Sequence, residues 1–189
     1  MCCNPNKMML RYLPWPGQGR TEMSKILFAE KDGTFVLKFV GDVRVTLGPT
    51  ISTFLDHLGK CESFQAVVID LTETEGIDST SLGMLAKISL CTQKAYGKVP
   101  TIVSANEDIT RLLMTVGFDE VFAIAAESVR TEAELLEMPQ ECVSEQNLRE
   151  QVLEAHRVLM SLNEQNKVEF EDLVKALEQE QSFEHSLAS

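Results

Sequence analysis

The chain has few of the residues on which catalytic and metal sites depend. Its only histidines are His57, His156 and His185, and none stands beside a nucleophile in the sequence, although distant side chains can meet on folding. The five cysteines include no C-x-x-C pair and no neighbouring histidine cluster, which argues against a disulfide framework or a zinc site. A glycine-rich phosphate loop is also missing. We therefore expect no metal, no cofactor and no catalysis by this chain.

Long apolar runs and positive charge are also scarce. No run approaches the length that crosses a membrane, and the N-terminus lacks the apolar core of a secretory signal, so we expect a cytoplasmic protein. The formal net charge of −12 disfavours nucleic acid and anionic membranes as partners. It suits a protein partner with a basic face.

Composition divides the 189 residues into three parts. Residues 1–22 carry scattered proline and glycine without a period, and we expect a disordered leader or a misassigned start ahead of Met23. Acylation of Cys2 or Cys3 is the functional alternative for this leader. Residues 23–138 have the regular pattern of one domain, and residues 139–189 form an acidic helical extension. From residue 141 onward, eleven acidic and four basic residues give this extension a net charge of −7.

The domain pattern predicts an α/β fold with a mixed sheet flanked by helices. Apolar runs at 26–30 and 34–40 flank Asp32-Gly33, which is a hairpin signal, and residues 41–44 read as a loop. Further strands are expected at 66–71, 98–103 and 121–122, and helices from Gly48, after Ser79, around 109–116 with a stop at Gly117, and at 131–137. A hairpin followed by βαβ crossovers gives a mixed sheet.

The segment Ile77-Asp78-Ser79-Thr80-Ser81-Leu82-Gly83 suggests a function. It follows the buried strand at 66–71 and precedes a helical pattern, so its hydroxyls belong at a helix start beyond the carboxyl end of a strand. One of the three hydroxyl residues could serve simply as the N-cap of that helix. The functional alternative is an exposed switch, because a phosphate there is favoured by the helix dipole.

The order of the elements resembles the STAS domain over about residues 24–136. The resemblance is carried by Gly41-Asp42-Val43-Arg44 after the second strand and by Val68-Ile69-Asp70-Leu71 ahead of the hydroxyl segment. It is closer to the bacterial anti-sigma factor antagonists. That implies a partner-switching cycle, in which the unmodified antagonist captures an anti-sigma factor and phosphorylation by a serine kinase ends binding. A serine phosphatase, or a response regulator with a phosphatase domain, restores it.

Matched by position, the family's aspartate falls on Asp78 and its phosphoacceptor on Ser79, with Thr80 and Ser81 as fallback acceptors. The resemblance further implies a partner-binding surface made of Asp42, Arg44, Asp78, Ser79, Thr80, Ser81, Leu82 and Gly83. Two positions depart from the family pattern: Ser81 replaces the usual glycine, and Arg44 replaces an acidic residue that is common there.

Two other functions compete with the switch. A non-switching STAS module, acting as a scaffold or as a transporter accessory subunit, needs the fold without a phosphorylatable serine. An enzyme using Asp78 and Ser79 directly would need more than the sequence offers, because no G-x-S-x-G motif surrounds the serine and no signature places a histidine near it.

The acidic extension predicts two amphipathic helices. One shows a narrow apolar seam made of Leu148, Val152, Ala155, Leu159 and Leu162. The other is expected to start at Asn166, which with Glu169 resembles a capping box. Periodicity alone does not name what covers the seam. The helices either pack back on the domain, self-associate with a second copy, or dock a regulator.

Overall fold

Six strands form one mixed sheet in the part of the chain that the structure describes. The structure is a computed structural model and describes residues 24–127, 134–141 and 143–187. The strand order is β5-β4-β3-β2-β1-β6. The elements are β1 (Lys25–Lys31), β2 (Thr34–Val43), η1 (Val45–Leu47), α1 (Gly48–Leu58), β3 (Ala66–Ile77), α2 (Ser79–Tyr96), β4 (Thr101–Val103), α3 (Glu107–Thr115), η2 (Phe118–Glu120), β5 (Ala123–Ala125), β6 (Leu136–Glu137), α4 (Glu145–Leu162) and α5 (Glu164–Leu187). The predicted α/β fold is confirmed, whereas the predictions for residues 1–22 lie outside the described residues.

The first two strands form the predicted hairpin. Lys31 pairs with Thr34, so Asp32 and Gly33 make a two-residue turn. Their φ angles are 52° and 76°, and two successive positive values are what a type I′ turn requires. The Asp-Gly pair therefore fixes the register of the hairpin, as the sequence predicted.

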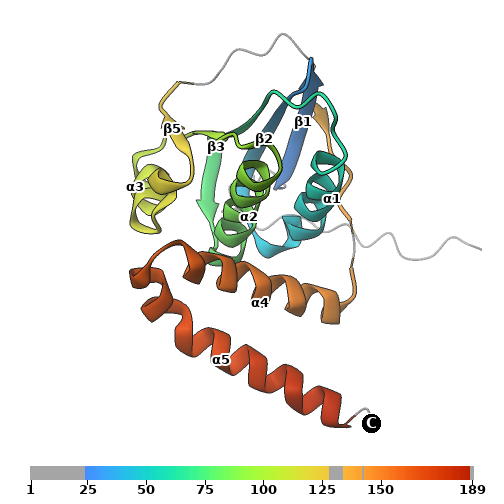
Figure 1. The fold of residues 1–189 in the computed structure, drawn as a ribbon, viewed down its shortest axis with the longest axis vertical. Coiled ribbons are helices and arrows are strands. Elements are labelled where there is room, and N and C mark those ends of the chain that lie inside the picture. Colours follow the sequence, from blue (N-terminus) through green and yellow to red (C-terminus); the bar gives the residue numbers. More distant parts are fainter. Residues whose placement is uncertain (1–23, 128–133, 142, 188–189) are drawn as a thin grey trace, which may run out of the picture.

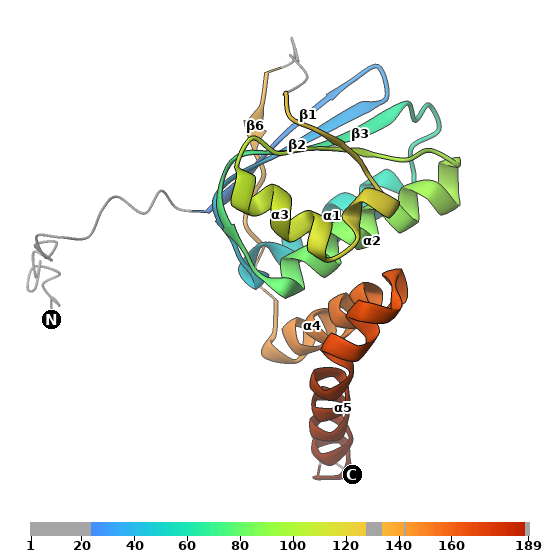
Figure 2. The same cartoon turned by 90° about the vertical axis from the view of Figure 1, so that its left-hand side faces the viewer.

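Helices α1, α2 and α3 lie on one side of the sheet (Figure 2). Strands β2 to β5 are neighbouring parallel strands joined by these helices, and crossovers of one hand put successive helices on the same face. The main core fills the space between this face and the helices, with Phe35, Leu37 and Phe39 of β2 pointing into it. A smaller apolar cluster on the opposite face includes Val36 and Val68. Strand β3 is therefore buried on both faces along its apolar run, as its sequence predicted.

Strands β2 and β3 are longer than their apolar runs. Val43 pairs with Ile77, whereas the register of β4 on β3 ends where Val103 meets Asp70. The predicted loop at 41–44 is therefore wrong for residues 41–43, which continue β2. Backbone pairing continues here through polar residues, where the hydrophobic pattern used to predict strands has stopped. The longer ribbon carries the ends of β2 and β3 beyond the rest of the sheet.

Two predictions near the end of the domain are wrong. Leu136 and Glu137, placed in a helix by their sequence, form β6 and pair with β1, while residues 131–133 lie outside the described residues. The strand expected at 121–122 is β5 at 123–125, after a short 3-10 turn. For β6, backbone hydrogen bonds to β1 override the local helix preference, whereas β5 is the expected strand at a later position.

Helix α4 packs back on the domain, across the helical layer on its side away from the sheet (Figures 1 and 2). Ala155 and Leu159 are part of the main core. Gln151 donates a hydrogen bond to Ser52 of α1, at 3.3 Å, which ties the first half of α4 to the domain. Of the alternatives for the extension, packing back on the domain is the one that α4 adopts. Within the described ranges, no helix combines the length and apolarity that crossing a bilayer requires.

Helix α5 starts earlier than the capping-box pattern predicted. It begins at Glu164, and the Asn163 side chain accepts a hydrogen bond from the backbone N–H of Asn166 at 2.8 Å. Asn166 itself is buried, and its side chain donates to the carbonyls of Val116 and Leu159. Asn163 therefore opens the helix, and Asn166 ties the α4–α5 corner to the end of α3.

Candidate functional site

The start of α2 is held by Asp78, and none of the three hydroxyl residues caps it. One carboxylate oxygen of Asp78 accepts from the backbone N–H of Ser81 at 2.7 Å, which is the N-cap bond. The other accepts from the backbone N–H of Val45 at 2.8 Å. Asp78 thus joins the helix start to the turn after β2. The prediction that a hydroxyl residue caps this helix is wrong, because the preceding aspartate takes that role.

The three hydroxyl residues differ in accessibility. Ser79, the first residue of α2, is half-buried, whereas Thr80 is 7% and Ser81 1% exposed. The Ser81 hydroxyl is buried without a hydrogen-bond partner among the described residues. Access alone therefore favours Ser79 as the acceptor of any modification.

His156 of α4 faces Ser79, and the sequence did not predict this. Its Nδ1 lies 2.8 Å from the carbonyl oxygen of Val152, which can only accept, so Nδ1 carries the proton. In the neutral imidazole Nε2 is then the acceptor, and the Ser79 hydroxyl donates to it across 3.0 Å. The imidazole is 2% exposed and packs against the Phe170 ring of α5. One signal in the sequence could have indicated this contact: His156 lies within the apolar stripe of an amphipathic helix.

This contact removes one argument against an enzyme but does not supply the rest of a catalytic site. No sequence signature places a histidine near Ser79, yet folding brings His156 to it. In hydrolases with a Ser-His-Asp triad, a carboxylate holds the other imidazole nitrogen. A backbone carbonyl, that of Val152, holds it here.

The predicted residues Asp42 and Arg44 lie near this helix start. Val43 pairs with Ile77, and its carbonyl accepts a hydrogen bond from the Asp78 N–H at 3.1 Å, so the backbone on either side of Val43 lies beside the start of α2. Asp42 and Arg44 form an exposed ion pair in which Arg44 Nη2 lies 3.3 Å from a carboxylate oxygen of Asp42. Exposed pairs contribute little stability, so these charges remain available to a partner.

Two other predicted contact residues do not lie on the surface. Leu82 is buried in the core. Gly83 lies beneath α4, where a Cβ added to it would stand 2.2 Å from the carbonyl oxygen of Ala155. Of the predicted contact residues, Asp42, Arg44, Asp78 and Ser79 keep some exposed surface, whereas Thr80, Ser81 and Leu82 are buried and Gly83 lies beneath α4.

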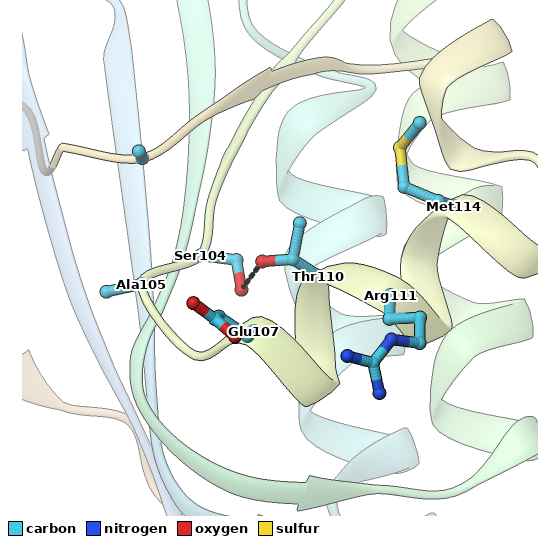
Figure 3. Close-up of a pocket in the computed structure, with 7 residues that line it drawn as sticks. Ser104, Ala105, Glu107, Thr110, Arg111 and Met114 are labelled. Carbon is cyan, nitrogen blue, oxygen red and sulfur yellow. Dashed lines mark hydrogen bonds between the residues drawn. The ribbon is translucent and has the colours of Figure 1, made fainter.

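A separate hollow of about 540 Å³ opens at the start of α3 (Figure 3). Its polar groups are largely engaged: Thr110 donates to Ser104 at 2.9 Å, and Arg111 binds Asp108 at 3.2 Å. None of the predicted site residues lines it. In the described ranges, no group of three or more His, Cys, Asp or Glu side chains is arranged to hold a metal ion.

Solved structures that are similar to this chain share little of its sequence. An anti-sigma factor antagonist from Mycobacterium paratuberculosis is 22% identical, with a TM-score of 0.46 over 55% of this chain and 86% of its own. The anti-sigma factor antagonist SpoIIAA in its unphosphorylated form is 10% identical, with a TM-score of 0.47 over 54% and 89%. The Bacillus cell fate determinant SpoIIAA in its phosphorylated form is 13% identical, with a TM-score of 0.41 over 54% and 92%.

None of the curated proteins compared with this sequence is detectably similar to it. The model of the STAS domain, however, matches residues 25–133, which covers β1 to β5 and the helix start at Asp78. Since that match spans more than half of the sequence, the chain belongs to the STAS domain family.

Proposed function

We propose that this protein is a cytoplasmic anti-sigma factor antagonist that is switched off by phosphorylation of Ser79. The observation that carries the proposal is the division of roles at the start of α2: Asp78 caps the helix, so the Ser79 hydroxyl is not needed for that purpose. Ser79 is also the most accessible of the three hydroxyl residues. The unmodified protein would bind an anti-sigma factor that is also a serine kinase.

A phosphate would act mainly at the interface with that partner. It adds about −1.5 to −2 charges. Within the chain, the helix dipole favours this charge by about 0.3–1 kcal/mol and the neighbouring Asp78 opposes it. Burying a dianion against a surface shaped for a neutral hydroxyl costs on the order of 3–5 kcal/mol, which weakens binding by hundreds-fold or more. Loss of binding therefore needs no refolding.

The test is a titration of the full chain against the anti-sigma factor kinases of the same organism. We expect Ser79→Ala to bind constitutively and Ser79→Asp to bind at least about a hundredfold more weakly, because only the latter adds charge at the interface. Thr80→Ala is the control and should be switched off by the kinase like the natural sequence. Equal affinities of the two Ser79 variants would contradict the proposal.

The serine phosphatase, or a response regulator with a phosphatase domain, enters the cycle as the enzyme that returns Ser79 to its hydroxyl form. After incubation with the kinase and nucleotide, phosphate mapping by mass spectrometry should find Ser79 modified. Added phosphatase should then remove this phosphate and restore binding. Phosphate on Thr80 or Ser81 instead would move the switch to a fallback acceptor.

A non-switching STAS scaffold or transporter accessory module is the second candidate. The hydrogen bond from Ser79 to His156 favours it, because the hydroxyl already has a partner inside the chain. The same mapping separates the two functions. A stable complex that forms with every partner tested while Ser79 stays unmodified would identify a scaffold.

A further inference from the structure

Helix α4 lies over the face of α2 that carries Ser79. Gly83 and Lys87 share that face, because residues four apart on a helix are neighbours. Gly83 lies directly against the backbone of Ala155, and Lys87 Nζ lies 2.8 Å from a carboxylate oxygen of Glu154. Consecutive residues of α4 thus meet positions spread over two turns of α2, so α4 crosses α2 rather than running along it (Figure 1).

We infer that α4, backed by α5, is a cover over Ser79 that must lift before this residue can be modified or meet a partner. The part concerning the partner rests on the proposed function. The part concerning access to Ser79 rests on the contacts of α4 alone. The occupant of this face of α2 is thus a named segment of the same chain, residues 145–162.

The contact with His156 shows why Ser79 is blocked in the covered form. Phosphoryl transfer from a nucleoside triphosphate forms a bond from Ser79 Oγ to phosphorus, breaks the bond to the nucleoside diphosphate, and sends the hydroxyl proton to a base of the kinase. In the covered form Oγ donates that proton to His156 Nε2, 3.0 Å away. Phe170 packs on the imidazole from the side of α5, so His156 is held in place. A phosphoryl group that approached Oγ from the side of α4 would meet His156.

The seam between α4 and the domain can open because its polar contacts are incomplete. Gln151 Oε1 is buried against Gly48 without a hydrogen-bond partner, and such an atom regains hydrogen bonds to water when the seam opens. The Lys87–Glu154 pair is partly exposed and is likewise re-solvated without loss. By contrast, Ala155 and Leu159 are completely buried, and their burial keeps α4 in place when no partner competes for the face of α2.

Gly83→Ala is the variant that should lift the cover. The added Cβ would meet three backbone atoms of Ala155 at 2.2, 2.6 and 2.8 Å, and a backbone cannot rotate away as a side chain can. Alanine is a better helix former than glycine, so α2 itself should not be weakened. Gly59→Ala is the matched control, because the nearest atom to its new Cβ is a backbone oxygen at 3.6 Å, an ordinary contact.

The test uses the full chain and needs neither kinase nor partner. Ser79→Cys introduces a thiol whose alkylation by iodoacetamide is followed by peptide mass spectrometry, together with amide hydrogen exchange of α4. We expect Gly83→Ala to speed both alkylation of the new thiol and exchange in α4 by about tenfold or more, since overpacking shifts the equilibrium toward the open form. Gly59→Ala should change neither quantity.

A milder variant guards against misfolding of Gly83→Ala. Lys87→Glu places like charges together at the seam, and we expect it to speed alkylation about two- to fivefold. Adding Glu154→Lys should restore the slow rate, which a general loss of stability would not allow.

Three results would contradict the inference that α4 covers Ser79. They are alkylation of the Ser79→Cys chain as fast as in urea, faster exchange of α4 without faster alkylation, and no effect of Gly83→Ala on either quantity. Because no partner is involved, each of these results would leave the proposed function to its own binding test.

Discussion

At the scale of single residues, Asp78 connects three parts of the site. Its two carboxylate oxygens hold the α2 start and the turn at Val45, and its backbone N–H donates to the Val43 carbonyl at 3.1 Å. One residue thus fixes the position of Ser79 relative to the charged end of β2. Its structural role is separate from any contact that it makes with a partner.

Replacing Asp78 should therefore lower stability as well as function. We expect Asp78→Ala to reduce the free energy of unfolding by about 2–4 kcal/mol, because it removes an N-cap and a second hydrogen bond to a charged group. Urea unfolding followed by circular dichroism measures this. Asp42→Ala is the control: it removes only an exposed ion pair and should cost at most about 1 kcal/mol. Similar costs for both variants would mean that Asp78 does not hold the two segments together.

At the scale of elements, α4 belongs to the domain more closely than its acidic sequence suggested. Its buried side chains reach the main core, and the corner with α5 is tied to Val116 through Asn166. The later part of α5 makes fewer contacts with the domain. The ion pair Arg157–Glu178, at 2.6 Å, joins it to α4, whereas Glu171 and Lys175 pair with each other within α5, at 2.9 Å.

Deleting different lengths of the extension should separate these contributions. Loss of residues 144–189 should leave the sheet folded but reduce the free energy of unfolding by about 3–5 kcal/mol, because the buried side chains of Leu153 and Leu159 are removed and the stabilisation from their burial is lost with them. Loss of residues 179–189 should change it by less than about 1 kcal/mol. Urea unfolding of the two truncated chains checks this, and equal losses would place the essential contacts at the far end of α5.

The hydrogen bond between Glu171 and Lys175 lowers the pKa of Glu171 from its usual 4.5 and raises the pKa of Lys175. For a carboxylate with a lowered pKa, the stabilisation is present above the unfolded pKa and is lost as the pH falls through the folded value. We expect α5 to lose helicity in acid, below the usual pKa of glutamate. Glu171→Gln should reduce that pH dependence slightly in circular dichroism spectra of otherwise identical chains, because the pair is exposed and α5 carries other carboxylates.

At the scale of the whole molecule, the sequence predicted the features that depend on residues close together in the chain. The hairpin follows from Asp32-Gly33, and the stop of α3 follows from Gly117, whose φ is 77°. Distant contacts could not be predicted in this way. Leu136 is a strand residue because it pairs with the backbone of β1. His156 meets Ser79 only because α4 folds across α2, 77 residues later. The site residues were thus predictable as a segment, but their cover was not.

Self-association through the C-terminal helices remains a prediction for the whole molecule. Val168 and Leu173 are exposed on α5, but acidic side chains surround them, and the chain carries a net charge of −12. Two copies meeting along α5 would bring like charges together. We therefore expect association to strengthen as salt is added, because screening weakens this repulsion. Sedimentation at low and high salt measures it, and a dimer that weakens with salt would point to a different interface.

The covalent link between α4 and the domain has a consequence for competition. A helix tethered near its docking face is present there at an effective concentration on the order of millimolar, whatever the concentration of the protein. A free partner at micromolar concentration must therefore bind the face of α2 about a thousandfold more tightly than α4 does to occupy half of the molecules. The chain itself therefore prevents weakly binding partners from occupying this face. Cutting the link between β6 and α4 would lower the affinity that a partner needs while leaving every contact at the seam unchanged.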